Sequence, residues 1–181
     1  ADSAGAAEAG RDYDSVYLPE DSLRNVYLPP FRAALDAGAG SVMSAYMDLN
    51  DVPATGNGFL LQEILRREWK FPGFVVSDAF AIRDLVTHGF AADPEDAAFR
   101  AFTAGVEMDM GSGTYLDNLA KLVQAGRIPV AAVDNAVGLI LAAKIRLGLF
   151  EHPYVEEGHA KDVFESREAR ELARTGAGRG C

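Results

Sequence analysis

The run Gly73–Asp78 (Gly-Phe-Val-Val-Ser-Asp) constrains the fold of this chain more than any other stretch. A glycine and an aromatic residue lead into two valines, and the run stops at a carboxylate. Strands that are covered on both faces read as continuous apolar runs and belong to parallel sheets. In an α/β barrel the catalytic groups lie at the carboxyl ends of such strands. The sequence therefore predicts a buried parallel strand that presents Asp78 at a functional face.

Helical and strand patterns alternate along the first 150 residues, which predicts right-handed βα units around a parallel sheet. The fold class is therefore α/β. Three strands are too few to close a barrel of eight, so the chain is either a small open sheet or the later part of a (β/α)8 barrel. The expected strands are Ser41–Tyr46, Gly73–Asp78 and Val106–Met110. The expected helices are Leu18–Ala37, Gly58–Trp69, Ala81–Val86, Asp93–Ala104, Thr114–Ala125 and Pro129–Leu147.

Local signals fix where several of these helices begin or bend. Pro29-Pro30 lies inside the first helical pattern and predicts a bend or a break there. The second helix is expected to be capped by Thr55 or Asn57. Asp93 followed by Pro94 is typical of a helix start, with the aspartate as the cap and the proline in the first turn.

From Glu151 onward the apolar periodicity is lost. We expect residues 1–150 to form the βα units, and residues 151–181 to form a linker and a disordered tail. Within this segment, Ser166–Arg174 could form one charged helix. The glycine-rich residues 175–181 hold no core-forming side chains.

Composition excludes several classes of partner and site. A net charge of −10 argues against nucleic acid and against an anionic membrane surface. No apolar run reaches the roughly 18 residues that a membrane span needs. The single cysteine is the last residue, and the three histidines (His88, His152 and His159) show no metal-ligand spacing, so a structural or solvent-facing role is expected for each. The sequence predicts no metal and no cofactor.

Three predicted strands end in or near a carboxylate: Asp48, Asp78 and Asp109. Such a group can be a nucleophile, a base or a metal ligand, or it can simply cap the next turn. Asp109 lies between two methionines, which favours a buried structural hydrogen bond. Ser77 has no histidine at a useful spacing, so a serine nucleophile is unsupported. Gly111-Ser112-Gly113 lacks the glycine spacing and the lysine of a phosphate-binding loop.

These motifs, in this order, resemble family 3 of the glycoside hydrolases, the β-glucosidase and β-xylosidase family, and its periplasmic bacterial branch in particular. The resemblance covers roughly residues 10 to 172. Gly73–Asp78 is similar to the nucleophile motif of that family. The further matching stretches are Gly10–Tyr13, Leu28–Phe31 with Ala37–Ala39, Ser41–Tyr46, Asn50–Ala54, Ala92–Ala97 and Gly148–Tyr154.

The resemblance implies that Asp78 is the nucleophile of a retaining β-glycosidase acting on terminal β-linked glucose or xylose. It implies that Tyr46 contacts the sugar close to the nucleophile, and that no metal or cofactor takes part. The Lys-His pair that binds the sugar, the first barrel strands and the second domain with the acid/base residue would all lie outside this sequence. Residues 175–181 stand where the apolar strand that opens the second domain is expected. The chain is therefore expected to be an inactive fragment of a periplasmic or secreted parent.

The sequence departs from the family pattern directly after the expected nucleophile. Relatives often carry tryptophan and then glycine there, where this chain has Ala79 and Phe80. Loss of the indole would remove one wall of the sugar pocket. One alternative function is that of the N-acetyl-β-hexosaminidase branch of the family, which usually has a second acid where this chain has Ala79. The remaining alternative is a non-catalytic α/β module in which Asp78 only caps a turn.

Overall fold

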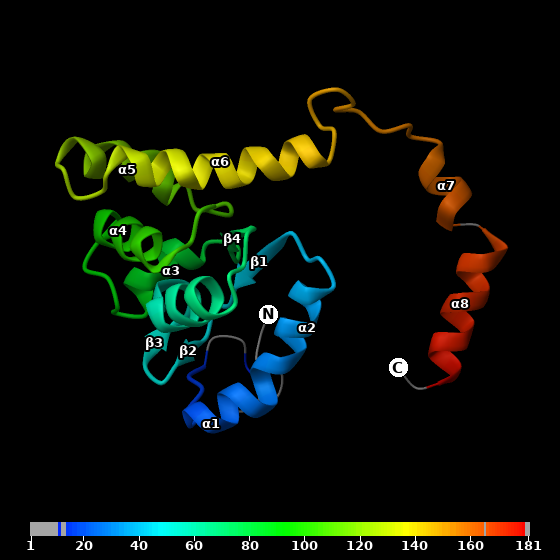
Figure 1. Ribbon diagram of the computed structural model, residues 1–181, viewed down its shortest axis with the longest axis horizontal. Coiled ribbons are helices and arrows are strands. Elements are labelled where there is room, and N and C mark those ends of the chain that lie inside the picture. The colour runs from blue at the N-terminus through cyan, green and yellow to red at the C-terminus, as the bar shows by residue number, and fades with distance from the viewer. Residues whose placement is uncertain (1–10, 12–13, 165, 180–181) are drawn as a thin grey trace. The chain divides into compact units, whose positions relative to one another are not determined.

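The computed structural model describes residues 11, 14–164 and 166–179. The chain forms two compact units that divide between Ala143 and Lys144. The strands are β1 (Ser41–Ser44), β2 (Asp48–Leu49), β3 (Val52–Pro53) and β4 (Phe74–Ser77). The helices, most of them labelled in Figure 1, are α1 (Glu20–Ser22), η2 (Leu23–Tyr27), α2 (Leu28–Asp36), η3 (Ala54–Gly56), η4 (Phe59–Glu68), α3 (Ala81–Thr87), α4 (Pro94–Ala104), α5 (Thr114–Gln124), α6 (Val130–Arg146), α7 (His159–Phe164) and α8 (Arg167–Gly178).

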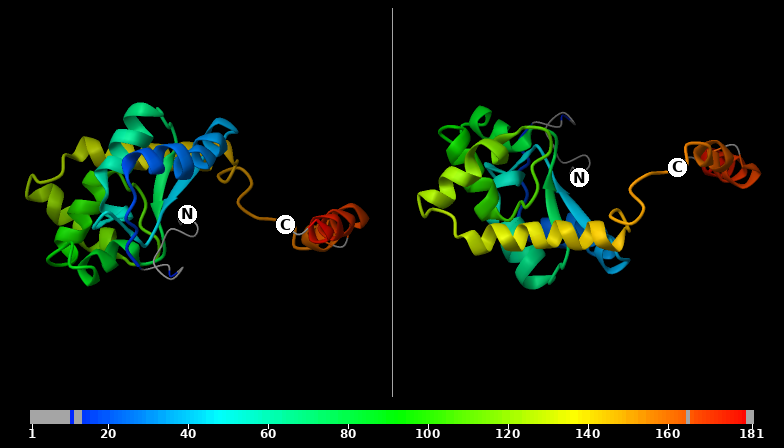
Figure 2. Two further views of the ribbon diagram at one scale, coloured as in Figure 1. Left: turned by 90° about the horizontal axis from the view of Figure 1, so that it is seen from below. Right: turned by 90° about the horizontal axis from the view of Figure 1, so that it is seen from above.

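The central feature of the first unit is the parallel pair of β1 and β4, which lie side by side in both views of Figure 2. Val42 pairs with Val75 and both contact the helical core, where Val75 is fully buried. Met43 pairs with Val76 on the opposite face, and Met43 is 39% exposed. One face of the pair is therefore covered by helices and the other is partly open.

The third predicted strand, Val106–Met110, forms only an isolated parallel bridge between Val76 and Met108. Side chains replace backbone partners on either side of that bridge. The Val75 amide donates to the Glu107 carboxylate at 2.7 Å, and the Met110 amide donates to the Ser77 hydroxyl at 2.9 Å. The segment therefore lies along β4 without a regular ladder, and the prediction of a full strand was wrong.

The first helix does not break at Pro29-Pro30. Helical structure runs from α1 through η2 into α2, with a wide π turn in which the Leu28 amide donates to the Leu23 carbonyl. The two prolines lie in the first turn of α2, directly after the π-helical segment η2. A missing N–H costs little there, because the first amides of a helix have no partner within it. Of the two expected alternatives, a bend or a break, the break was wrong because the π turn accommodates the prolines.

The loop after β1 contains an antiparallel hairpin of β2 and β3 that the sequence did not predict. Its two turn residues, Asn50 and Asp51, have positive φ values of 51° and 66°. Two left-handed residues in succession match the tight turn that suits a hairpin, and Asn and Asp tolerate this conformation. Asn50 also exchanges two hydrogen bonds with the backbone of Leu18, which ties the hairpin to the N-terminal segment.

The expected helix caps are largely confirmed. Of the two candidates for η4, Asn57 provides the cap, because its side-chain oxygen accepts from the Leu60 amide at 3.1 Å. Thr55 is instead buried and bonds to Ser44 and to the Ala45 carbonyl. Asp93 accepts from the Asp96 amide at 2.8 Å, as predicted for the start of α4.

The main core of the first unit lies between the covered face of β4 and the helices η4, α3, α4 and α5. A second, smaller cluster lies under the N-terminal segment and the hairpin. Fully buried residues of the main core include Val75, Ile82, Ala97, Ala98, Ala101, Val106 and Leu122.

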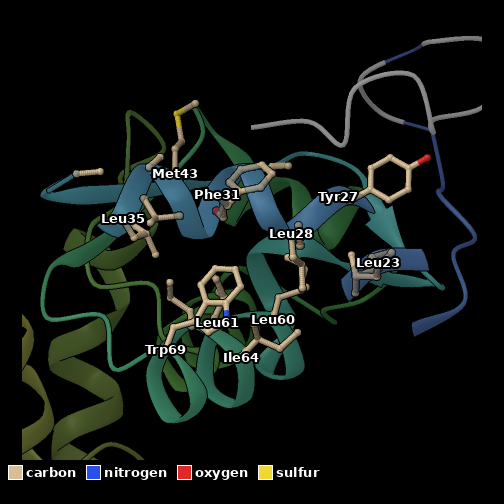
Figure 3. Close-up of a pocket in the computed structure, with 18 of the residues that line it drawn as sticks. Leu23, Tyr27, Leu28, Phe31, Leu35, Met43, Leu60, Leu61, Ile64 and Trp69 are labelled. Atoms are coloured by element: carbon tan, nitrogen blue, oxygen red, sulfur yellow. The ribbon is translucent and has the colours of Figure 1, made fainter. Parts of the chain in front are cut away.

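An apolar cavity of about 320 Å³ lies between α2, β1 and η4. Figure 3 shows Phe31 and Leu35 of α2 on one side of this cavity, and Ile64 and Trp69 on the other. Neither Tyr46 nor Asp78 lines it. The cavity is therefore a packing gap between the helical layer and β1, separate from the end of β4.

The second unit contains α7 and α8, which contact each other. Ser166 caps α8 by accepting from the Ala169 amide at 3.1 Å. The helix runs to Gly178. The division into βα units over residues 1–150 and a linker with a disordered tail over residues 151–181 stays a prediction. Of the matching stretch Gly10–Tyr13, only Arg11 lies within the described residues. Among the helices that the structure describes, none combines the length and apolar character needed to cross a membrane.

Candidate functional site

Asp78 directly follows the last residue of β4, as the sequence predicts. The preceding Ser77 is fully buried and pairs with Ser44 of β1, while Asp78 is only partly buried. One carboxylate oxygen of Asp78 accepts from the Ala79 amide at 2.7 Å. This contact leaves most of the acceptor capacity of the carboxylate for other groups. The parallel strand thus delivers a partly exposed carboxylate at its carboxyl end.

Tyr46 lies beside the turn that follows Asp78. The parallel pairing of β1 with β4 brings the ends of both strands to the same edge, and Tyr46 comes two residues after β1. Its hydroxyl donates to the Ala79 carbonyl at 2.8 Å. The structure therefore brings together the two site residues that the sequence singled out, and their role toward a sugar stays a prediction.

The turn after Asp78 is held on both sides. The Phe80 amide donates to the Met110 carbonyl at 2.8 Å, and the Ala81 amide donates to the Asp78 carbonyl at 3.1 Å. The Ser77 hydroxyl accepts from the Met110 amide. Since Ser77 is fully buried and serves as this acceptor, the structure gives no support to a serine nucleophile.

Asp109 has the structural role that its position between two methionines predicts. Its carboxylate accepts from the Ser112 hydroxyl at 2.7 Å and from the Tyr115 amide at 3.2 Å, in the first turn of α5. These bonds place a negative charge at the positive end of the helix dipole. The Gly111–Gly113 loop is thus already bonded to a carboxylate, which disfavours binding of a phosphate there.

Asp48 pairs with His88, a partner that sequence reasoning missed. The His88 Nδ1 and an Asp48 carboxylate oxygen lie 2.7 Å apart, with side-chain exposures of 13% and 19%. The pair links β2 to the end of α3. The expected structural role of His88 is therefore confirmed, but only the fold could reveal its partner, because the two residues are 40 positions apart.

A second missed feature is the ion pair of Arg66 and Glu107. Both oxygens of Glu107 lie 2.8 Å from one guanidinium nitrogen, while the other nitrogen donates to the carbonyls of Phe71 and Gly73. Burial raises the pKa of the Glu107 carboxyl, against the opposing effects of the Val75 amide and Arg66. The only sequence signal was that Glu107 is one of two acidic residues, with Asp109, in the predicted strand Val106–Met110.

The described residues contain no group of three or more acidic, histidine or cysteine side chains that could hold a metal ion. Of the strand-end carboxylates in that part of the chain, Asp48 and Asp109 are engaged by His88 and by α5. In the same part of the chain, the carboxylate of Asp78 accepts only from the adjacent Ala79 amide. The arrangement suits attack by a carboxylate on an electrophilic carbon, with a proton donor supplied from elsewhere.

Comparison with known proteins decides the family. The sequence profile of the glycosyl hydrolase family 3 N-terminal domain matches residues 1–143. The chain belongs to glycosyl hydrolase family 3. This finding supports the resemblance that the motifs around Asp78 indicated.

Individual relatives within family 3 agree. The chain is 42% identical over 179 residues to a periplasmic β-glucosidase of Salmonella typhimurium, covering 94% of this chain and 23% of the relative. It is 42% identical over 143 residues to a β-xylosidase of Formosa agariphila, covering 74% and 20%. A crystal structure of a β-glucosidase from Listeria innocua with glucose matches at a TM-score of 0.89 and 38% identity, covering 94% and 24%. The chain thus spans about a quarter of the length of these family 3 relatives.

Proposed function

We propose that this chain is part of a retaining β-glycosidase in which Asp78 is the nucleophile. The observation that carries the proposal is the position of Asp78, which is partly exposed at the carboxyl end of β4 and lies next to Tyr46 in a family 3 sequence. The relatives are named as β-glucosidases and β-xylosidases, so the expected substrates end in β-linked glucose or xylose.

In the proposed reaction an Asp78 carboxylate oxygen attacks the anomeric carbon and forms a covalent glycosyl ester. The bond to the leaving oxygen breaks, and that oxygen takes a proton from a general acid. Water then cleaves the ester, returns a proton to the same residue and restores the original anomeric configuration. The resemblance to family 3 implies that this acid lies in a second domain of the parent protein. Retention needs its carboxyl group about 5–5.5 Å from that of the nucleophile.

Tyr46 is expected to position the nucleophile loop and to contact the sugar. Its hydroxyl already fixes the Ala79 carbonyl, which follows directly on Asp78. A phenol in this place can also donate to a sugar or carboxylate oxygen when the turn shifts. Removing the hydroxyl would therefore loosen the carboxylate that must attack.

We further propose that the first unit is the later part of a (β/α)8 barrel. Two observations support this: one face of the sheet exposes Met43 and Met108, and an apolar cavity lies beside β1. Both would be covered if further strands continued the sheet beyond β1. Because a close relative is named as periplasmic, we expect the parent to be periplasmic or secreted.

A mechanism-based inhibitor tests the nucleophile. We would expose the full-length parent protein to an activated 2-deoxy-2-fluoro-β-glucoside and map the adduct by peptide mass spectrometry. The expected adduct lies on the peptide that contains Asp78 and is absent from Asp78→Asn. Asp117→Asn, which removes an exposed carboxylate of α5, is the matched control and should label normally. Absence of any adduct at Asp78 would favour a non-catalytic module.

A further inference from the structure

The turn after Asp78 contains an unusual backbone conformation. Phe80 has φ 65° and ψ −2°, in the left-handed region that bulky residues rarely occupy. The other non-glycine residues with positive φ among those that the structure describes have ordinary reasons: Asn50 and Asp51 form a hairpin turn, and Lys70 follows the end of η4. An aromatic residue held in this region carries strain, and such strain clusters at functional sites.

The turn is fixed by contacts that do not require a phenylalanine. The Phe80 amide donates to the Met110 carbonyl, and Tyr46 holds the Ala79 carbonyl. Glycine would make the same backbone bonds without strain, because it has no Cβ. Any function of phenylalanine at position 80 must therefore come from its ring, because the backbone bonds do not need it.

The Phe80 ring is not part of the core. It is 44% exposed and belongs to neither buried cluster. The Arg83 guanidinium carbon lies 4.8 Å from the ring centroid, and the ring edge lies beside Gly111, where an added Cβ would be 3.7 Å away. The ring is thus presented near the carboxyl end of the strands, two residues after the proposed nucleophile.

We propose that Phe80 is an aromatic wall of the glycoside site and that Arg83 donates hydrogen bonds to the sugar beside it. The C–H groups of a β-pyranoside face are apolar and slightly positive, and they pack well on an aromatic ring. A guanidinium next to the ring offers several N–H donors to sugar hydroxyls. This inference rests on the proposed function, because it deepens the substrate site around Asp78.

The test is a sugar titration of the full-length parent protein, which supplies the sugar-binding pair expected outside this sequence, followed through backbone amide chemical shifts. The probe is methyl β-D-glucopyranoside, which carries no aromatic aglycone. In the wild type we expect amides of residues 78–81 and 110–111 to respond. We expect Phe80→Gly and Phe80→Ala to raise the Kd by about fivefold, and Phe80→Trp to keep it.

Two controls separate the effect of losing the Phe80 ring from an effect on the backbone of the turn. Phe59→Ala removes another exposed phenylalanine that has an arginine, Arg24, over its ring, and it should leave the Kd unchanged. Thermal unfolding separates strain from ring loss: Phe80→Gly should have a higher Tm than Phe80→Ala, because only glycine relieves the left-handed conformation.

Each outcome has one meaning. An unchanged Kd in Phe80→Gly, with the responding amides still at residues 78–81, overturns the aromatic wall and leaves the proposed site intact. A response confined to other residues, or no response in the wild type, overturns the proposed sugar site and this inference with it. A Kd raised by about fivefold in both Phe80→Gly and Phe80→Ala, with the wild-type Kd kept in Phe80→Trp, supports the aromatic wall.

Discussion

At the scale of single residues, the Arg66–Glu107 pair ties the segment before β4 to the segment that lies along it. Arg66 and Glu107 are 18% and 11% exposed, and between them they bond to two carbonyls before β4 and to the Val75 amide within it. Glu107 thereby replaces a backbone acceptor in the third strand. Substituting either residue should therefore disturb the position of β4, and with it the position of Asp78.

We predict that Arg66→Met lowers the free energy of unfolding by about 3 kcal/mol, because it leaves a buried carboxylate without its partner. Glu107→Gln should cost less, since an amide oxygen can still accept from the Val75 amide. Urea denaturation measures both. Arg67→Met is the matched control: Arg67 is 69% exposed, pairs with Glu63, and should contribute less than about 1 kcal/mol. Equal losses for Arg66→Met and Arg67→Met would contradict the prediction.

Gly73 supports a second residue-scale prediction. A Cβ at this position would collide with the Gly40 carbonyl and the Phe71 ring, so the starts of β1 and β4 can approach each other only through glycine. Gly73→Ala should therefore lower the free energy of unfolding by about 1–3 kcal/mol. Gly58→Ala, where nothing lies within 4 Å of the added Cβ, should not destabilise the chain. A neutral Gly73→Ala would show that the two strand starts can move apart without cost.

At the scale of secondary structure, local signals predicted the elements whose boundaries are set by nearby residues. Asp93 caps α4 from three residues away, and β4 is bounded by Gly73 and Asp78 much as its apolar run suggests. The third strand and the π turn before Pro29 were mispredicted because their hydrogen bonds depend on distant or wide pairings. Val75 bonds to the Glu107 side chain across 32 positions, which no local pattern can reveal.

The start of α4 carries a pH-dependent contribution to stability. Burial opposes ionisation of Asp96, but the ion pair with Arg100 and the Ala92 amide together hold the pKa of Asp96 below its usual value. A carboxyl whose pKa is depressed in the folded state stabilises above the unfolded pKa, and the effect is lost as the pH falls.

We therefore predict that Asp96→Asn lowers the Tm at pH 7, by an amount equivalent to less than about 1 kcal/mol because the pair is partly exposed. The difference from wild type should shrink as the pH approaches 3, where the wild-type carboxyl is also becoming neutral. Asp36→Asn, which breaks an exposed pair with Arg32 in α2, is the control. A difference that stays constant between the two pH values would rule out Asp96 ionisation as its source.

At the scale of the whole molecule, the first unit exposes apolar surface that a complete domain would be expected to cover. Met43, Met108 and Met110 are each at least 36% exposed on or near the strands. Large exposed apolar surfaces mark sites of interaction or missing structure. The sequence predicted that barrel strands and a second domain lie outside this chain, and the roughly quarter-length coverage of the relatives agrees with that prediction.

This incompleteness leads to a prediction about activity. Among the strand-end carboxylates of the described residues, Asp48 and Asp109 already serve His88 and α5, so neither is available as the acid that a retaining mechanism requires. Removing an essential catalytic group typically costs several orders of magnitude in rate. We therefore expect the isolated chain to hydrolyse p-nitrophenyl β-glucoside no faster than a buffer blank.

The measurement is release of p-nitrophenolate by the purified chain, with Asp78→Asn in parallel. Equal, background rates for both proteins are expected. Adding azide provides a sharper test: a small anion can attack a glycosyl ester directly, but it cannot replace the acid that must first protonate a poor leaving group. Activated dinitrophenyl β-glucoside with azide should therefore be turned over only if Asp78 can still attack. Turnover of the unactivated substrate that disappears in Asp78→Asn would show that this chain contains a complete catalytic pair.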